Sequence, residues 1–248
     1  MLTKEKIYFA SDFHLGSPTL KDSHKREKLI VSWLNDIEKN AKAVYLVGDV
    51  FDFWFEYKKV IPKGFVRFLG KLAELTDNGI DVHFFVGNHD LWMQDYLEKE
   101  VGIKVHHENI TIRERGKEIF IGHGDGLGKG DYFYKFLRKI FTSKICQWIF
   151  ARLHPNFAFS LAHAWSKGSR KSGENASFIS KEKEILYGYC KEQQSINPVD
   201  YYIFGHRHFP LKLKVDEKAT YINTGDWLQH YTYAVLDNGN LELKTYTT

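Results

Sequence analysis

The sequence contains little cysteine and has no long hydrophobic run. Its two cysteines, Cys146 and Cys190, are isolated and lack the CxxC or paired spacing of zinc sites and disulfide frameworks. No run approaches the roughly 18 apolar residues of a membrane span, and the first residues contain no apolar segment followed by a small-residue cleavage site. We therefore expect free thiols in a reducing compartment and a cytoplasmic protein with at most peripheral membrane contact.

A strong charge of one sign is also absent. The net charge of +4 makes the chain only mildly basic, which suits an anionic substrate or a membrane surface but does not require nucleic acid. Aromatic residues, in contrast, make up 16% of the chain, which is rich for a soluble protein. Because 248 residues lie at the upper end of one α/β domain, we expect a single domain over residues 1–248 that carries an inserted elaboration.

Three short apolar runs, at 7–14, 43–52 and 81–90, share one pattern. Each is rich in β-branched and aromatic residues and delivers polar residues where a strand would end. Between them, residues 24–40 and 63–76 place apolar side chains on one face of a helix. This alternation predicts βαβ crossovers and a parallel sheet.

The pattern changes after Val101. A hairpin is expected around Arg115 and Gly116, and an Asn-Gly turn joins two alternating strands near the end of the chain, so a second, partly antiparallel sheet is predicted. Residues 131–194 show no strand-like alternation, and we expect a mainly helical insertion there. Within it, residues 166–177 are rich in Ser, Gly and Lys, which favours a flexible joint.

Five segments place side chains that can bind metals directly after strand-like runs. A single Asp-x-His would be explained better by a turn or by a histidine packed in the core, but turns alone do not produce an ordered series. Open α/β sheets bind ligands at the carboxyl ends of their strands, so residues far apart in sequence can converge there. The candidate ligands are Asp12, His14, Asp49, Asn88, His123, His206 and His208.

The ordered motifs resemble the calcineurin-like metallophosphoesterase superfamily. This resemblance implies an α/β fold, namely a four-layer αββα metallophosphoesterase sandwich, here with a helical cap insertion at about 131–194. All five motifs are present between residues 12 and 208. They are Asp12-x-His14, Gly48-Asp49-x2-Asp52, Gly87-Asn88-His89-Asp90, Gly122-His123-Gly124-Asp125 and Gly205-His206-Arg207-His208.

The resemblance further implies two divalent metal ions that share Asp49. A carboxylate can span two cations, and neutral imidazoles suit Mn, Fe or Zn. Mn is favoured because the ligands mix nitrogen and oxygen without a thiolate, and Fe or Zn are the alternatives. Such a pair would bind a phosphoryl group and lower the pKa of a bound water. One ion would be held by Asp12, His14, Asp49 and His208, and the other by Asp49, Asn88, His123 and His206.

The resemblance places His89 outside both ligand sets. There it would face the phosphate as a proton donor or charge stabiliser, with Asp90 orienting its ring, a role that suits an imidazole near neutral pH. The alternative is a turn histidine held by Asp90. Asp52 and Asp125 would orient ligand side chains, although a plain Gly-Asp-Gly turn explains Asp125 nearly as well.

A narrower resemblance points to the UDP-2,3-diacylglucosamine pyrophosphatases of lipid A synthesis. It is carried by the chain length, by "HGDGL" followed by Asp131, by the helical insertion and by the late "GDW". The implied reaction cleaves a nucleotide-linked glycolipid to UMP and 2,3-diacylglucosamine 1-phosphate. Proteobacterial members usually have Arg where this chain has His89. The implied substrate contacts are Asn88, His89, Asp131, Ser166, Lys167, Arg170, Lys171 and His206.

The segment 131–165 combines aromatic and leucine side chains with basic residues. A basic amphipathic helix is typical of a membrane surface, and an apolar lid would suit acyl chains. The alternative is that these aromatics only pack the insertion onto the core, and both can hold together.

Two other functions fit the same motifs. One is a metallophosphodiesterase that acts on another nucleotide, a cyclic phosphodiester or a nucleic acid end. Against a nucleic acid substrate, the insertion is more apolar than a groove that binds a phosphate backbone would be. The other is a non-catalytic binding scaffold of the same fold. Because every expected metal ligand is present, the sequence favours the enzyme.

Overall fold

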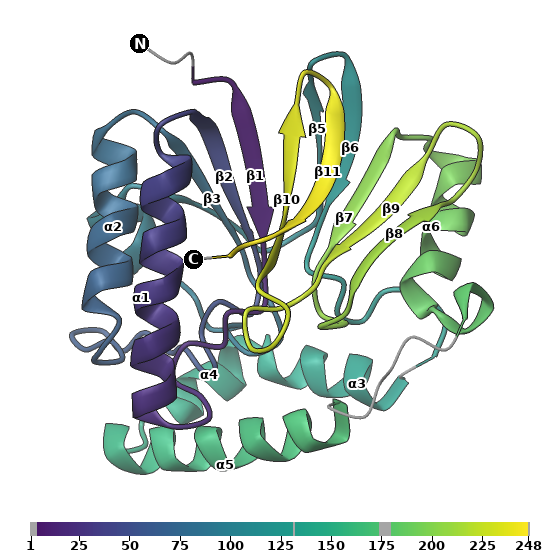
Figure 1. Ribbon diagram of the computed structural model, residues 1–248. Coiled ribbons are helices and arrows are strands. Elements are labelled where there is room, and N and C mark those ends of the chain that lie inside the picture. The colour runs from purple at the N-terminus through teal and green to yellow at the C-terminus, as the bar shows by residue number, and fades with distance from the viewer. Residues whose placement is uncertain (1–3, 131, 174–179, 248) are drawn as a thin grey trace.

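The computed structural model describes residues 4–130, 132–173 and 180–247, with the backbone alone for residues 133, 163, 165 and 167–173. Two sheets stand face to face (Figure 1). The strands of the first sheet, in spatial order, are β11 (Asn240–Thr245), β10 (Thr232–Asp237), β1 (Lys6–Ala10), β2 (Ala41–Val47), β3 (Asp81–Phe85) and β4 (Lys104–His106). Those of the second are β5 (Ile110–Glu114), β6 (Lys117–Ile121), β7 (Tyr201–Phe204), β9 (Thr220–Thr224) and β8 (Pro210–Lys214).

The pairing follows the sequence expectation. Strands β1 to β4 are parallel, and β10 and β11 extend the first sheet antiparallel. In the second sheet β6, β7 and β9 are parallel, whereas β5 and β8 run antiparallel at its edges. The hairpin at Arg115 and Gly116 joins β5 to β6, where Arg115 has φ 52° and Gly116 has φ 74°.

Helices cover the outer face of each sheet. The helices α1 (Leu20–Ile37) and α2 (Val66–Asp77), with the short π-helix η1 (Leu97–Val101), pack on the first sheet around Trp33, Phe68 and Leu97. The helix α6 (Ile185–Ile196) packs on the second through Leu186 and Cys190. Between the sheets lie residues such as Ile7, Phe9, Ile121 and Ile203. The predicted αββα sandwich is therefore confirmed.

Helix α1 begins earlier than the apolar pattern indicated. Thr19 caps it by accepting a hydrogen bond from the backbone N of Asp22 at 3.2 Å. The first turn is mostly exposed, so its residues do not show the apolar periodicity from which a start near residue 24 was predicted.

The helical segment after β6 divides into two groups. The helices α3 (Tyr132–Phe141), α4 (Lys144–Phe150) and α5 (Pro155–Gly173) lie below the sandwich, at the ends toward which β1, β2 and β3 point (Figure 1). A short 3-10 turn, η2 (Lys181–Lys183), then leads to α6. Because α6 covers the second sheet, only α3 to α5 form the layer below, which we call the cap helices.

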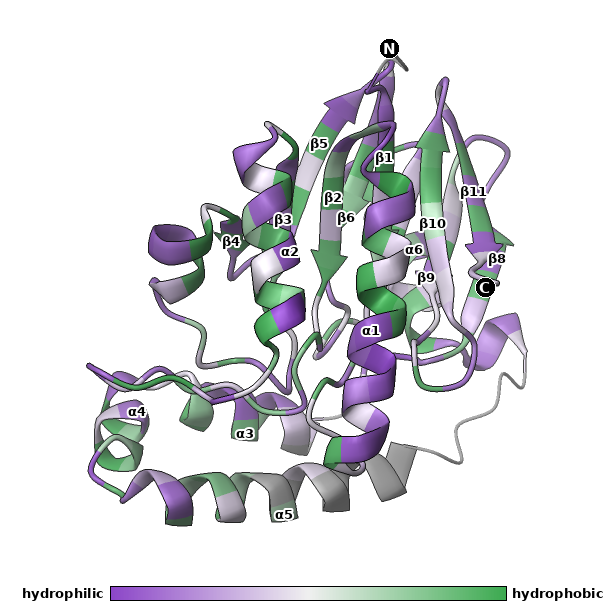
Figure 2. Ribbon diagram, turned by 60° about the vertical axis from the view of Figure 1, so that its left-hand side comes forward, coloured by the Kyte–Doolittle hydropathy of each residue, from purple (hydrophilic) through white to green (hydrophobic). Residues whose placement is uncertain are grey.

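The flexible joint predicted for residues 166–177 is wrong over most of its length. Helix α5 continues to Gly173, and residues 174–179 lie outside the described part of the chain. The Ser, Lys and Arg residues that suggested a joint are compatible with a helix, because their helix propensities cost little once the preceding turns are packed. Figure 2 shows that hydrophobic stretches also lie on α4 and α5, away from the sheets. None of the helices in the described residues is long and apolar enough to cross a bilayer.

A ladder of rings crosses the inner face of the first sheet. Phe9, Tyr45 and His83 stack in succession, with centroid distances of 5.1 Å and 4.3 Å. His83 then stacks on His106 at 5.2 Å, and His83 Nδ1 lies 2.8 Å from His106 Nε2. Burial, with smaller contributions from His106 and Lys104, lowers the pKa of His83 to about 4.

This ladder predicts a loss of stability in mild acid. In the unfolded chain His83 binds a proton near pH 6.5, whereas in the folded chain it does so only near pH 4. Between these values the unfolded state holds more protons, so lowering the pH favours unfolding. We expect His83→Phe, which keeps the stack, to lose less stability than the parent chain between pH 7 and pH 5 in urea titrations. Equal losses in both proteins would contradict this assignment.

Candidate metal centre

The candidate ligands follow the carboxyl ends of five strands. The loop after β1 carries Asp12 and His14, the loops after β2 and β3 carry Asp49 and Asn88, the loop after β6 carries His123, and the loop after β7 carries His206 and His208. Because the sheets face each other, these loops meet at one edge, directly above the cap helices (Figure 1). The structure brings all seven predicted ligands together.

The first group of ligand atoms surrounds His14 Nε2. This nitrogen lies 3.2 Å from His208 Nε2, 3.8 Å from Asp12 Oδ1 and 3.8 Å from Asp49 Oδ2. Asp12 Oδ1 is also 3.2 Å from His208 Nε2. Ligand atoms about 2.0 to 2.2 Å from one metal ion lie roughly 3.0 to 3.5 Å apart. The group therefore has dimensions close to those of a single coordination shell.

The second group shares Asp49 with the first. Asp49 Oδ2 lies 3.3 Å from His123 Nε2, and Asn88 Oδ1 lies 3.2 Å from His123 Nε2 and 2.9 Å from His206 Nδ1. His123 is oriented by its other ring nitrogen, since Nδ1 lies 2.9 Å from the carbonyl oxygen of Val47. A proton held there by the carbonyl leaves the Nε2 lone pair for a metal.

The chemistry of the buried donors fits cations. Asp12 is fully buried, and its Oδ2 accepts hydrogen bonds from Ser11 Oγ and the backbone N of His206. Its Oδ1 accepts no hydrogen bond from the described part of the chain and faces the first group. A buried carboxylate oxygen without a donor is costly unless a cation compensates it.

Electrostatics within the site lead to the same conclusion. Burial opposes ionisation of Asp49, but the surrounding histidines, His123 first, hold the pKa of its carboxyl well below its usual range. Burial likewise opposes protonation of His123, yet Asp49 raises the pKa of that ring well above its usual value. Asp12 and Asp49 thus create a strong demand for positive charge, which divalent ions would satisfy in place of a proton.

Most of the candidate ligands have left-handed backbone conformations. Residues other than Gly rarely adopt positive φ, at a cost of roughly 1 to 2 kcal/mol each, and a cluster of such residues is typical of functional sites. The φ values are 55° at Asp12, 43° at His14, 51° at Asp49, 67° at His206 and 55° at His208. Asp and His are among the residues enriched at positive φ, but no sequence pattern identifies these positions directly.

Two glycines allow the loops to approach closely. A Cβ on Gly87 would lie 2.3 Å from Asp49 Oδ1, and a Cβ on Gly205 would lie 2.5 Å from Asp12 Oδ2. Both distances are far below van der Waals contact, so any side chain at either position would displace a proposed ligand. The glycines that precede Asn88 and His206 therefore permit tight turns at the centre.

Arg26 is a site residue that the sequence analysis missed. It lies in α1, and its buried guanidinium donates from Nε to the carbonyl of Phe13 at 2.6 Å and from Nη2 to those of His14 and Ser17. A charged donor that binds three carbonyls fixes the loop after β1. In the sequence, Arg26 stands among the polar residues of a helix as a surface arginine would, so no sequence signal identifies it.

Asp226, in the "GDW" after β9, was also missed. Its Oδ2 lies 3.5 Å from His208 Nδ1, and its Oδ1 accepts from the backbone N of Gln229 and His230 at 3.0 Å each. Although burial opposes it, the bond to His208 lowers the pKa of Asp226 to about 2. A carboxylate on Nδ1 orients the imidazole and makes it more basic. The available signal was a further Gly-Asp directly after a strand-like run, like Gly48-Asp49.

The expected role of Asp90 is wrong. Asp90 does not contact the His89 ring. It accepts hydrogen bonds from the backbone N of Gly87 at 2.6 Å, of Val50 at 2.9 Å and of Phe51 at 3.3 Å. Asp90 therefore ties the loop after β3 to the loop after β2. The turn directs the carboxylate of Asp90 toward these backbone N–H groups and away from the His89 ring. The sequence pattern does not reveal this direction.

Asp52 and Ser166 contact the His89 ring instead. His89 Nδ1 lies 3.1 Å from the carbonyl oxygen of Asp52 and 3.1 Å from Ser166 Oγ. The Asp52 carboxylate lies 3.7 Å from His14 Nδ1, which agrees with its expected orienting role. Ser166 is buried and comes from α5, so this helix reaches the centre at the position named as a substrate contact.

Asp125 connects the centre to the cap helices. Its Oδ2 accepts from Tyr134 Oη at 2.6 Å and from Arg138 Nε at 2.8 Å, both on α3. It therefore holds α3, and none of its described contacts orients a ligand. Asp131 lies outside the described residues, and so do the side chains of Lys167, Arg170 and Lys171, whose backbone continues α5.

The cap helices dock on the core through aromatic rings. Phe150 of α4 lies 4.5 Å from Trp92 and 5.9 Å from Phe53 between ring centroids, and Phe159 of α5 lies 5.3 Å from Phe53. Trp92 Nε1 donates to the carbonyl of Phe141 at 2.6 Å. We call these five residues the aromatic cluster. Packing onto the core thus accounts for part of the aromatic content of the insertion.

The fold is a sandwich of two sheets with carboxylate and imidazole side chains at the strand ends. A comparison with known families agrees with this architecture. The profile described as calcineurin-like phosphoesterase matches residues 5–210. The chain belongs to this family, which confirms the superfamily resemblance.

Several curated relatives share one name, UDP-2,3-diacylglucosamine hydrolase. The protein of that name from Porphyromonas gingivalis is 40% identical, and the alignment covers 98% of this chain and 98% of the relative. Those from Vibrio parahaemolyticus and Haemophilus influenzae are 28% and 27% identical, covering 95% and 90% of this chain and 96% and 91% of the relatives.

The contact between Asp226 and His208 predicts weaker metal binding in Asp226→Asn. The amide keeps the shape but loses the charge that orients and polarises His208, so we expect Mn²⁺ affinity to fall about 10- to 100-fold. Calorimetric titration of the metal-free protein measures this. Asp237→Asn, which changes an exposed carboxylate paired with Lys6, is the control. Equal affinities in both variants would rule out this role.

Proposed function

We propose that the chain hydrolyses the diphosphate bond of UDP-2,3-diacylglucosamine, forming UMP and 2,3-diacylglucosamine 1-phosphate for lipid A synthesis. The observation that carries the proposal is the convergence of seven side chains that can bind metals, next to the aromatic-rich cap helices. A phosphoesterase site next to an apolar layer suits a phosphate ester that carries lipid chains. The names and full-length alignments of the relatives support the same substrate.

We assign two divalent ions to the centre. Asp12, His14, Asp49 and His208 would hold one, and Asp49, Asn88, His123 and His206 the other, with Asp49 shared. The mixed oxygen and nitrogen donors favour Mn, with Fe or Zn as alternatives. When bound, such ions activate water and neutralise charge on a phosphoryl group.

His89 is assigned to the substrate phosphates. Burial lowers its pKa to about 4, so its ring is neutral near pH 7 in the free protein. The Asp52 carbonyl favours a proton on Nδ1, which leaves Nε2 for the substrate. A bound diphosphate adds negative charge and raises the pKa of this ring. His89 would then donate a proton to the phosphate or stabilise its charge, while Ser166 holds the ring in place.

The remaining substrate contacts are assigned by position. Asn88 and His206 face the shared centre and would lie next to the reacting phosphate. Ser166 contacts His89 from α5. The backbone of this helix continues through Lys167, Arg170 and Lys171, which therefore follow the contact directly. Basic side chains there would bind the diphosphate, and Asp131 would contact the glucosamine unit.

The cap helices are assigned to the acyl chains and to a membrane surface. The aromatic cluster borders His89 through Asp52 and Phe53, where acyl chains would pack. Other apolar side chains face solvent, such as Ile145 at 74% and Trp148 at 60% exposure. Arg152 lies over the Trp148 ring at 4.6 Å. Exposed apolar residues with basic neighbours are typical of peripheral contact with anionic lipid, here the cytoplasmic face of the inner membrane.

The substrate assignment is tested directly. The purified, Mn²⁺-loaded chain is expected to release UMP from UDP-2,3-diacylglucosamine in detergent micelles, as measured by chromatography. Asp49→Asn should abolish this release because it removes the shared carboxylate. The proposal fails if the loaded protein releases no UMP yet efficiently hydrolyses simple phosphodiesters.

The role of His89 predicts different outcomes for two substitutions. His89→Gln keeps hydrogen bonding but carries no charge, and we expect kcat to fall about 10²- to 10⁴-fold. His89→Arg supplies a permanent charge, as in the proteobacterial pattern, and should retain most of the activity. Loss of activity in both variants would show that the transferable proton, rather than the charge, is required.

A further inference from the structure

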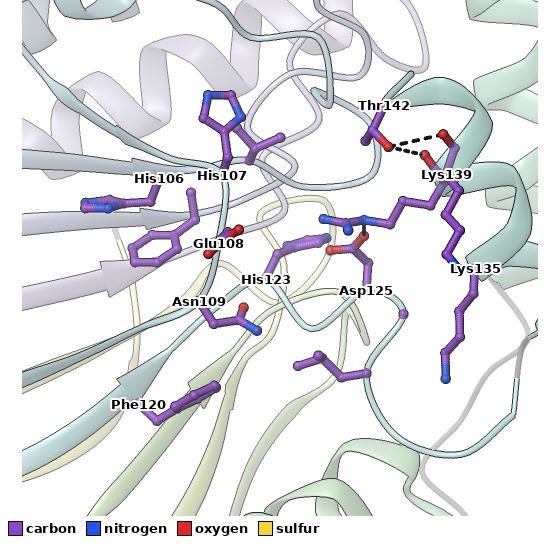
Figure 3. A pocket seen from close by; sticks show the side chains of 15 residues that line it. His106, His107, Glu108, Asn109, Phe120, His123, Asp125, Lys135, Lys139 and Thr142 are labelled. Atoms are coloured by element: carbon purple, nitrogen blue, oxygen red, sulfur yellow. Dashed lines mark hydrogen bonds and ion pairs between the residues drawn. The ribbon is translucent and has the colours of Figure 1, made fainter. Parts of the chain in front are cut away.

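A cavity of about 600 Å³ lies beside the metal centre (Figure 3). It shares His123 and Asp125 with that centre, and its other walls come from the loop after β4, from β6 and from α3. Its volume lies in the range of roughly 300 to 1,000 Å³ that is typical of small-molecule sites. The aromatic cluster contributes none of the residues that line it.

One wall of the cavity is cationic. Lys135, Arg138 and Lys139 line it from consecutive turns of α3. The charge of Arg138 is balanced by Asp125 at 2.8 Å, and Lys135 Nζ donates to the carbonyl of Gly128 at 2.5 Å. Two lysine charges therefore exceed the single charge of Glu108 on the opposite side, which favours an anionic occupant.

The opposite wall offers an amide and an aromatic ring. Figure 3 shows Asn109 between Phe120 and His123. A Cβ on Gly122 would lie 1.8 Å from Asn109 Oδ1, so the Asn109 side chain packs over Gly122, next to the proposed ligand His123. Asn109 is exposed, so its amide can reach a ligand in the cavity. An Asn amide combines a donor and an acceptor, which matches the hydrogen-bonding edge of a pyrimidine base.

We propose that this cavity is the nucleoside subsite of the enzyme, and this rests on the proposed function. Asn109 binds the edge of the uracil ring, Phe120 supplies an apolar wall, and the lysines of α3 favour the phosphate end near His123. The nucleotide half of the substrate thus enters from the His123 side, while the acyl half extends from His89 toward the aromatic cluster. The two chemically different halves occupy different walls around one reacting phosphate.

The test compares UMP with ribose 5-phosphate, which has no base, as inhibitors of UMP release. We expect Asn109→Ala to raise the inhibition constant of UMP and the KM of the lipid nucleotide about tenfold each, as for the loss of a paired amide contact. Inhibition by ribose 5-phosphate should stay the same. Lys139→Ala should weaken both inhibitors. Asn35→Ala, on the exposed face of α1, is the matched control.

The outcomes separate the subsite from the overall function. One outcome is that the parent chain releases UMP while Asn109→Ala has the same inhibition constant for UMP and the same KM as the control. In that case the cavity is not the nucleoside subsite and the proposed function stands. If only Lys139→Ala has an effect, and equally on both inhibitors, the cavity binds anions without reading the base, which also overturns the proposal. If no UMP is released, calorimetry with UMP and Mn²⁺-loaded protein still decides whether Asn109 contributes to nucleotide binding.

Discussion

The structure depends on how the buried carboxylate of Asp49 is held between the two sheets. Its Oδ1 accepts a hydrogen bond from the backbone N of His89 at 2.8 Å, while its Oδ2 faces His14 from the first sheet and His123 from the second. A carboxylate in this position is stable only if positive charge compensates it. The same group therefore brings residues of both sheets together at this edge and creates the demand for cations.

Several features that look unrelated serve this arrangement. A Cβ on Gly48 would lie 2.4 Å from His123 Nδ1, so the loop after β2 must begin with a residue that has no side chain. Asp90 accepts hydrogen bonds from, and Arg26 donates them to, backbone groups of neighbouring loops. Their hydrogen bonds hold the left-handed conformations of the ligand residues, whose cost the rest of the fold must offset.

The surroundings of the centre divide by chemistry. Toward Phe53, α4 and α5 the walls are aromatic, and toward the basic residues of α3 they are polar and cationic. A substrate with a nucleotide at one end and acyl chains at the other has the same division. Asp125 lies on the polar side, two residues after His123, and anchors α3 through Arg138. The position of α3 is thereby coupled to the loop that carries a proposed metal ligand.

The sequence by itself determined the fold class and the seven candidate ligands. Alternating apolar runs separate strands from helices, and the carboxyl ends of parallel strands must meet at one edge. It could not determine that Asp52 and Ser166, rather than Asp90, contact the ring of His89, or that α5 continues through residues predicted as a joint. Nor did it reveal Arg26 or Asp226. These features depend on which way a side chain leaves a loop and on packing between distant segments. Local patterns carry no information on either, so only the tertiary structure decided them.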